Sequence, residues 1–171
     1  MKKLFIALML CCGLCYADGL TIYHITAQMW VESNGDWRAI SNKNCHGPMQ
    51  VMPATGAEYG YPEWALTHPV IGMDAGIEIM RDLWSRFVTL ESDSRSRFVT
   101  NSNSRTIKDY LIHDVRRNIL RNQTWALALS AFNCGYSRTL KALRLGHRWR
   151  DGIPAETRHY IKKVLRQYYR R

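Results

Sequence analysis

The stretch TIYHITAQMWVES, residues 21–33, decides the fold and carries the first candidate functional residue. Its apolar residues Ile22, Ile25 and Met29 recur at steps of three and four, which is the spacing of one helix face. Glu32 continues this stripe, so its carboxyl group is predicted to turn inward. Burial penalises the charged form, which raises the pKa of a carboxyl group and lets it keep a proton to donate. The alternative is a helix-end Glu that turns to solvent, and spacing alone favours that alternative.

The length and the N-terminus bound the organisation of the chain. Its 171 residues suffice for one domain with a core and are hardly enough for two. Residues 1–17 combine a basic start, an apolar run and a final small residue, which predicts a secretory signal cleaved after Ala17. The apolar run is too short to span a bilayer. Residues 18–171 are therefore expected to form one exported, periplasmic domain without a stable membrane span, and a monomer.

The charge balance is strongly basic. Removal of the signal lowers the formal net charge from +10 to +8, because Lys2 and Lys3 are lost. Eleven of the basic residues lie between Arg138 and Arg171. Such a balance favours anionic partners. An exported protein rarely meets nucleic acid, so an anionic cell-wall polymer is the expected partner, although a solvated helix face explains the cluster equally well.

Two cysteines, Cys45 and Cys134, remain after removal of the signal. In an oxidising compartment an isolated pair is a disulfide candidate. The bond would close a long loop, worth about 4–5 kcal/mol in the chain-entropy model. Two cysteines without a CxxC pair or a clustered His set make a poor zinc site. No metal and no organic cofactor are expected.

Strand signals are scarce, and the pattern predicts an all-helical single domain with long loops. Helices are expected over residues 21–33, 55–59, 70–87, 110–120, 125–132, 139–145 and 155–169. Residues 37–53 are rich in Asn, Ser, Gly and Pro and are predicted to be mostly loop. Residues 85–89 (SRFVT) are repeated at 96–100, which we interpret as a duplication inside a surface loop.

Four short motifs follow one another along the chain. They are Glu32-Ser33, GPMQVMP at residues 47–53, AFNCG at 131–135 and ETRHY at 156–160. In this order and spacing they resemble the transglycosylase SLT domain of the soluble lytic transglycosylases, relatives of goose-type lysozyme. The resemblance covers about residues 21–164. It implies a mostly helical fold of the α+β lysozyme-like superfamily, here an all-α single compact domain, that acts on peptidoglycan.

The resemblance also implies a role for each matched residue. Glu32 falls on the catalytic acid of the family. The other matched residues are implied to bind the substrate or support the site: Ser33, Ser41, Met49, Gln50, Phe132, Asn133, Glu156 and Tyr160. Amide side chains suit the hydroxyl and N-acetyl groups of amino sugars, because they both donate and accept hydrogen bonds. The same amides can tie loops to backbone, and a Glu in the first turn of a helix can complement the helix dipole.

Several residues depart from the family pattern. Phe132 replaces a tyrosine whose hydroxyl lies near the reacting centre in the family, and Tyr136 and Tyr160 are candidate substitutes. Pro48 replaces a leucine and stiffens its loop. Residues 87–120 look like an insertion relative to the family core.

The two cysteines are a further departure, because Cys45 and Cys134 stand where the family commonly has alanine. Both lie in motifs that converge on the site in the family. The resemblance therefore implies a Cys45–Cys134 disulfide.

The matched motifs provide a single catalytic carboxylate, which suits the lytic transglycosylase reaction better than a two-carboxylate glycosidase mechanism. Three alternatives stay open. The first is a lysozyme-type muramidase, in which water attacks. The second is a peptidoglycan-binding assembly factor of low activity, and the third, nucleic-acid binding, rests on charge alone. Small exported members of the family resemble accessory enzymes of secretion, pilus or conjugation machines, so such an apparatus is an expected partner.

Overall fold

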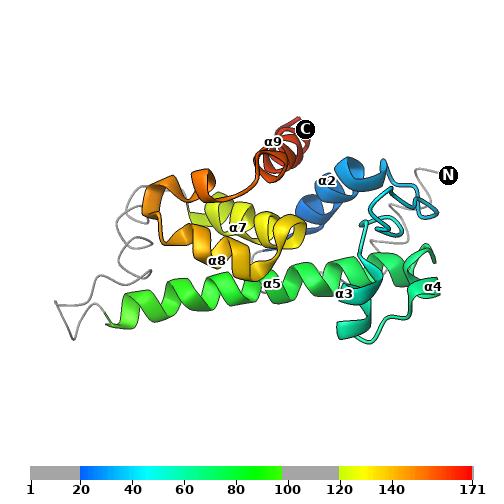
Figure 1. Ribbon diagram of the computed structural model, residues 1–171, viewed down its shortest axis with the longest axis horizontal. Coiled ribbons are helices and arrows are strands. Elements are labelled where there is room, and N and C mark those ends of the chain that lie inside the picture. The colour runs from blue at the N-terminus through cyan, green and yellow to red at the C-terminus, as the bar shows by residue number, and fades with distance from the viewer. Residues whose placement is uncertain (1–19, 98–119, 171) are drawn as a thin grey trace. The chain divides into compact units, whose positions relative to one another are not determined.

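The structure, a computed structural model, describes residues 20–97 and 120–170. Helices account for nearly all of its regular structure (Figure 1). They are α2 (Ile22–Ser33), α3 (Pro53–Glu58), α4 (Glu63–Leu66), α5 (Ile71–Arg97), α7 (Leu120–Cys134), α8 (Tyr136–Leu143), the 3-10 helix η1 (Gly146–Gly152) and α9 (Ala155–Tyr169). In the described ranges, β-pairing is limited to isolated bridges of His46 with Ile40 and with Val51. The predicted all-helical class, consistent with a lysozyme-like SLT domain, is confirmed.

The chain divides into two units by its internal contacts. The first consists of the residues up to Ile77 together with Val164–Arg171, and the second runs from Glu78 to Lys163. Helices α5 and α9 each contribute residues to both units. No helix in the described part of the chain combines the length and the apolar character needed to cross a membrane.

Helix α2 forms as the sequence predicts. The imidazole Nδ1 of His24 accepts a hydrogen bond of 3.0 Å from the backbone N–H of Thr21, which closes the first turn. Ile25 and Met29 of the predicted apolar stripe are 0% and 3% exposed. Asn34 has a left-handed backbone (φ 55°) and its N–H bonds to the carbonyl of Trp30, so the helix ends where the sequence places its stop.

Helix α5 corrects the sequence prediction. It runs to Arg97, ten residues beyond the predicted end at Phe87. The first copy of the duplicated segment, residues 85–89, is therefore helical, and its interpretation as a surface loop was wrong. No Gly or Pro occurs between residues 77 and 97 to stop the helix, and Asp82 forms an i,i+4 ion pair of 2.9 Å with Arg86.

Several other predictions fall wholly or partly outside the described residues. The signal peptide, most of the second repeat copy and the predicted helix 110–120 belong to this group, apart from Leu120, where α7 begins. Helix α7 thus starts five residues before the predicted Trp125. Helix α9 has the predicted bounds, whereas α4 and η1 were not predicted.

Candidate active site

Glu32 lies in the last turn of α2 and is half-buried. The prediction that it turns inward from an apolar stripe is consistent with this position, because the preceding stripe residues Ile25 and Met29 are buried. The C-terminal turn of a helix exposes carbonyl groups and carries partial negative charge. Glu32 therefore lies at the negative end of α2, and its role as the catalytic acid stays a prediction.

Ser33 connects the end of α2 to the GPMQVMP loop. Its hydroxyl donates a hydrogen bond of 2.9 Å to the carbonyl oxygen of Pro48 and lies 3.5 Å from the carbonyl of Met29. The structure therefore gives Ser33 a positioning role, in which it holds the loop against the turn that carries Glu32. Its predicted contact with substrate stays a prediction.

Backbone packing explains why the loop begins with glycine. Gly47 has a left-handed backbone (φ 75°), and a Cβ atom there would lie 1.8 Å from the carbonyl oxygen of Leu66 in α4. Met49 is 0% exposed and packs against α5, where a Cβ atom at Gly76 would come within 2.3 Å of the Cβ of Met49. The structure shows a packing role for Met49, and its predicted sugar contact stays a prediction.

Gln50 is half-buried and has a left-handed backbone (φ 49°), which is uncommon for a residue with a side chain. Its Nε2 donates to the carbonyl oxygens of Ala39 (3.2 Å) and Gly47 (3.0 Å). The amide therefore ties the loop to backbone, which was the alternative role recognised from the sequence. Its Oε1 makes no hydrogen bond within the described residues, so it can still accept one from a sugar hydroxyl or amide.

Ser41 and Cys45 close a tight turn beside this loop. The Ser41 Oγ accepts from the N–H of Cys45 (3.0 Å), and the Ser41 N–H donates to the Cys45 carbonyl (2.9 Å). Cys45 and Cys134 are both half-buried and carry free thiols in this structure. Their disulfide stays a prediction, as does the placement of Ser41 near the cleaved bond.

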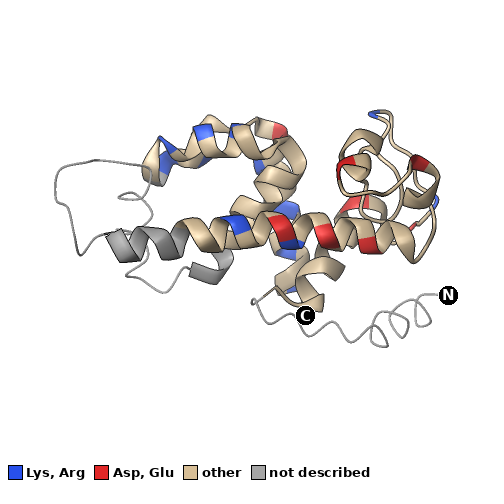
Figure 2. Ribbon diagram, turned by 90° about the horizontal axis from the view of Figure 1, so that it is seen from below, with Lys and Arg blue, Asp and Glu red and all other residues tan. Residues whose placement is uncertain are grey.

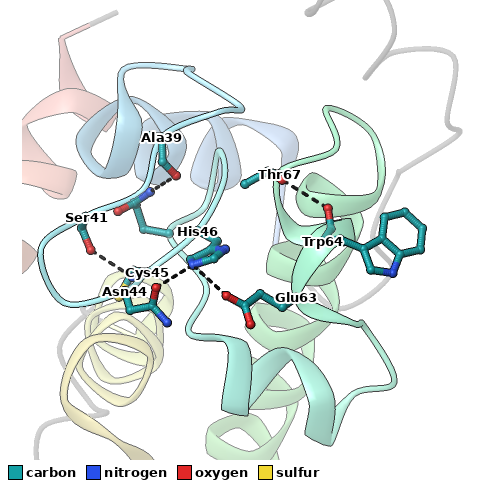
Figure 3. A network of polar contacts seen from close by, with 9 residues as sticks. Ala39, Ser41, Asn44, Cys45, His46, Glu63, Trp64 and Thr67 are labelled. Carbon is teal, nitrogen blue, oxygen red and sulfur yellow. Dashed lines mark hydrogen bonds and ion pairs between the residues drawn. The ribbon is translucent and has the colours of Figure 1, made fainter.

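His46 is a structural residue that the sequence reasoning missed. Its buried Nε2 lies 2.9 Å from Oδ1 of Asn44 and 3.5 Å from Oε1 of Glu63 in α4 (Figure 3). Both partners are acceptors, so Nε2 carries the hydrogen. His46 also exchanges both backbone hydrogen bonds with Val51, at 2.8 and 2.9 Å. The sequence signal for this role was the position of His46, directly before the GPMQVMP motif and among residues that are typical of turns.

In the second unit, Asn133 joins two helices that carry motifs. Its Oδ1 accepts a hydrogen bond of 2.7 Å from the hydroxyl of Thr157, which is 1% exposed at the start of α9. The AFNCG and ETRHY motifs are thereby brought together. Arg158 reinforces the start of α9, because its Nη1 donates to the carbonyls of Ile153 (2.8 Å) and Arg150 (3.1 Å).

The remaining predicted residues occupy different environments. Glu156 is exposed in the first turn of α9, where a negative charge complements the helix dipole. Tyr160 is 8% exposed, and Phe132 is half-buried. The ring of Tyr136 lies 5.4 Å from that of Phe87, and the guanidinium of Arg86 lies 5.1 Å from its centre. Tyr136 is therefore held by contacts with α5.

Comparison with known proteins identifies the family. The model of the transglycosylase SLT domain matches residues 16–149, which includes Glu32 and the GPMQVMP and AFNCG motifs and leaves out ETRHY. Searches of curated proteins and of solved structures found no significant match. In the described ranges, no group of three or more His, Cys, Asp or Glu side chains is arranged to hold a metal ion. The chain belongs to the transglycosylase SLT domain family, whose general activity is lytic transglycosylation of peptidoglycan.

Proposed function

We propose that the protein cleaves the β-1,4 bond between N-acetylmuramic acid and N-acetylglucosamine and releases a 1,6-anhydromuramoyl product. The observation that supports this most directly is the position of Glu32, half-buried in the last turn of α2 within the family match. A carboxyl group that is partly withdrawn from water near the negative end of a helix is suited to donate a proton.

One residue then serves as acid and base in turn. The Glu32 carboxyl group protonates the glycosidic oxygen, and the bond from that oxygen to C1 of the muramoyl residue breaks. The N-acetyl group of the substrate stabilises the positive charge at C1. The Glu32 carboxylate then takes the proton of the muramoyl 6-hydroxyl, and O6 bonds to C1. No water is consumed, and Glu32 ends protonated as it began.

The loop contacts support the same assignment. Ser33 holds the GPMQVMP loop at the end of α2, and Gln50 is fixed by two carbonyl groups with its Oε1 still able to accept. A rigid acceptor costs little entropy when a sugar binds, because its side chain is already ordered. We further propose that the protein is exported and opens the wall locally for an envelope-spanning apparatus.

Product analysis tests the reaction. Purified protein and its Glu32→Gln variant are incubated with peptidoglycan, and the soluble products are examined by mass spectrometry. We expect anhydromuramoyl products from the wild type and a loss of at least about 100-fold in rate for the variant, because a general acid typically contributes that much. Reducing-end muramic acid would show hydrolysis instead. Binding without cleavage would indicate an assembly factor, for which the Phe132 departure provides the reason.

A further inference from the structure

The second unit carries an uncompensated basic face on α8. Arg138 and Lys141 of α8 and Arg144, which caps the C-terminal end of the helix, follow one another at steps of three residues, and all three are exposed. The opposite face of the helix, with Thr139, Ala142 and Leu143, is buried. We call Arg138, Lys141 and Arg144 the α8 ridge. Its side chains share one side of the helix because three-residue steps keep residues on neighbouring positions of a helix surface.

The charges of the α8 ridge are not neutralised by the described residues. None of its three cations forms an ion pair with a carboxylate in the described ranges. The sequence contains no Asp or Glu from residue 115 to residue 150. Figure 2 marks the Lys and Arg positions of the described residues in blue and the Asp and Glu positions in red. The nearby Arg148 differs, because it bonds to Asp151 at 2.8 Å. Three like charges on one face repel one another, so their arrangement favours an anionic ligand.

The α8 ridge follows directly on a motif of the candidate site. Helix α7 ends at Cys134 in the AFNCG motif, and α8 begins at Tyr136. A helix rises about 1.5 Å per residue, so the three cations are spread over about 9 Å along α8. Such a row suits a ligand that carries several separated negative charges better than a single small anion.

We infer that the α8 ridge binds the acidic stem peptides of the peptidoglycan strand. This inference rests on the proposed function, because the stem peptides are attached to the muramoyl residues of that substrate. Each stem peptide that does not donate a cross-link ends in a free carboxylate and carries further acidic groups, so neighbouring stems present repeated negative charge. Guanidinium and ammonium groups bind carboxylates through charge-assisted hydrogen bonds.

A lipid surface is the other anionic partner to weigh. Peripheral binding to a membrane combines basic residues with apolar side chains that enter the bilayer. The exposed large apolar side chain next to the α8 ridge is Leu145, which is 50% exposed; within α8, Ala142 and Leu143 are buried and Leu140 is half-buried. The composition of the face therefore favours a soluble polyanion over a membrane.

A binding experiment decides between these partners. The inactive Glu32→Gln protein is sedimented with intact peptidoglycan, with the same material after an amidase has removed its stem peptides, and with phosphatidylglycerol vesicles. The ridge variant adds Arg138→Gln, Lys141→Gln and Arg144→Gln. The matched control adds Lys162→Gln, Lys163→Gln and Arg166→Gln, which removes the same charge from exposed positions of α9.

We expect the ridge variant to bind intact peptidoglycan about tenfold more weakly than the control, with no difference on stem-free glycan. The difference should disappear near 1 M salt, where the screening length is about 3 Å. Equal binding by the two variants, equal losses on both forms of glycan, or a loss confined to vesicles would overturn the inference. Circular dichroism of each variant checks that it is folded. Failure of the proposed reaction appears separately, as absence of cleavage by the protein with Glu32 intact.

Discussion

The hydroxyl of Ser33 donates a 2.9 Å hydrogen bond to the carbonyl oxygen of Pro48, and this bond joins the last residue of α2 to the GPMQVMP loop. The candidate acid Glu32 precedes Ser33 directly. In the Glu-Ser pair, the first residue therefore carries the carboxyl group, and the second fixes the GPMQVMP loop beside it.

Loss of the Ser33 hydroxyl should destabilise the protein. For Ser33→Ala we expect the free energy of unfolding to fall by about 0.5–1.5 kcal/mol, because one partly buried hydrogen bond is lost and the Pro48 carbonyl loses its donor. Urea denaturation followed by circular dichroism measures the change. Ser33→Thr keeps a donor and serves as the control. Equal stability of Ser33→Ala and the wild type would show that the bond contributes nothing.

Two substitutions at Gln50 separate its side chain from its backbone. Both Gln50→Ala and Gln50→Gly remove the bonds to Ala39 and Gly47, but only glycine adopts the observed φ of 49° without a steric penalty. We expect the glycine variant to be more stable than the alanine variant by about 1 kcal/mol. Thermal denaturation of both proteins measures this difference. A more stable alanine variant would contradict the left-handed conformation.

The substitution Gly76→Ala should destabilise the protein, which is the opposite of the usual effect of this change within a helix. Replacement of a helical glycine by alanine normally stabilises a protein by about 1 kcal/mol. At Gly76 the new Cβ atom would lie 2.3 Å from the Cβ of Met49, so we expect Gly76→Ala to destabilise by about 1–3 kcal/mol instead. Chemical denaturation gives the sign directly. A gain in stability would mean that α5 and the loop are not in close contact.

Gln28 offers a stabilising substitution. It is 0% exposed, and neither Nε2 nor Oε1 has a hydrogen-bond partner among the described residues. Burial of an unbonded amide is unfavourable, so Gln28→Met should raise the free energy of unfolding by about 1–2 kcal/mol. The comparison is Gln50→Met, which removes a bonded amide and should lower stability. A destabilised Gln28→Met protein would show that the amide is bonded in solution.

The predicted disulfide is tested by counting thiols. Protein prepared from an oxidising compartment, with residues 1–17 removed, should show no titratable thiol under denaturing conditions before reduction. After reduction, the thiols of Cys45 and Cys134 should both react. Two titratable thiols would refute the Cys45–Cys134 pair. Because both thiols are free in the structure, the prediction rests on the compartment and on the family resemblance.

Sequence reasoning placed several helix limits well because local signals define them. Asn34 and Gly35 end α2, and Pro154 precedes the start of α9, as the sequence indicated. It failed at α5, where the serine-rich segment suggested a loop. Serine is a weak helix former, but without Gly or Pro nothing forces a helix to end there.

The sequence by itself determined the helical class, because that follows from periodicity, and it fixed the order of the motifs. Glu32 became the candidate acid through the resemblance of those motifs to the SLT domain, because spacing alone favoured a solvent-facing residue. Only the tertiary structure decided what the motif residues contact. It showed that Ser33 holds Pro48, that Met49 packs against Gly76, and that Gln50 is tied to backbone carbonyls. These contacts join segments separated along the chain, and their geometry depends on the packing of α2, α4 and α5 around one loop, which no local pattern encodes.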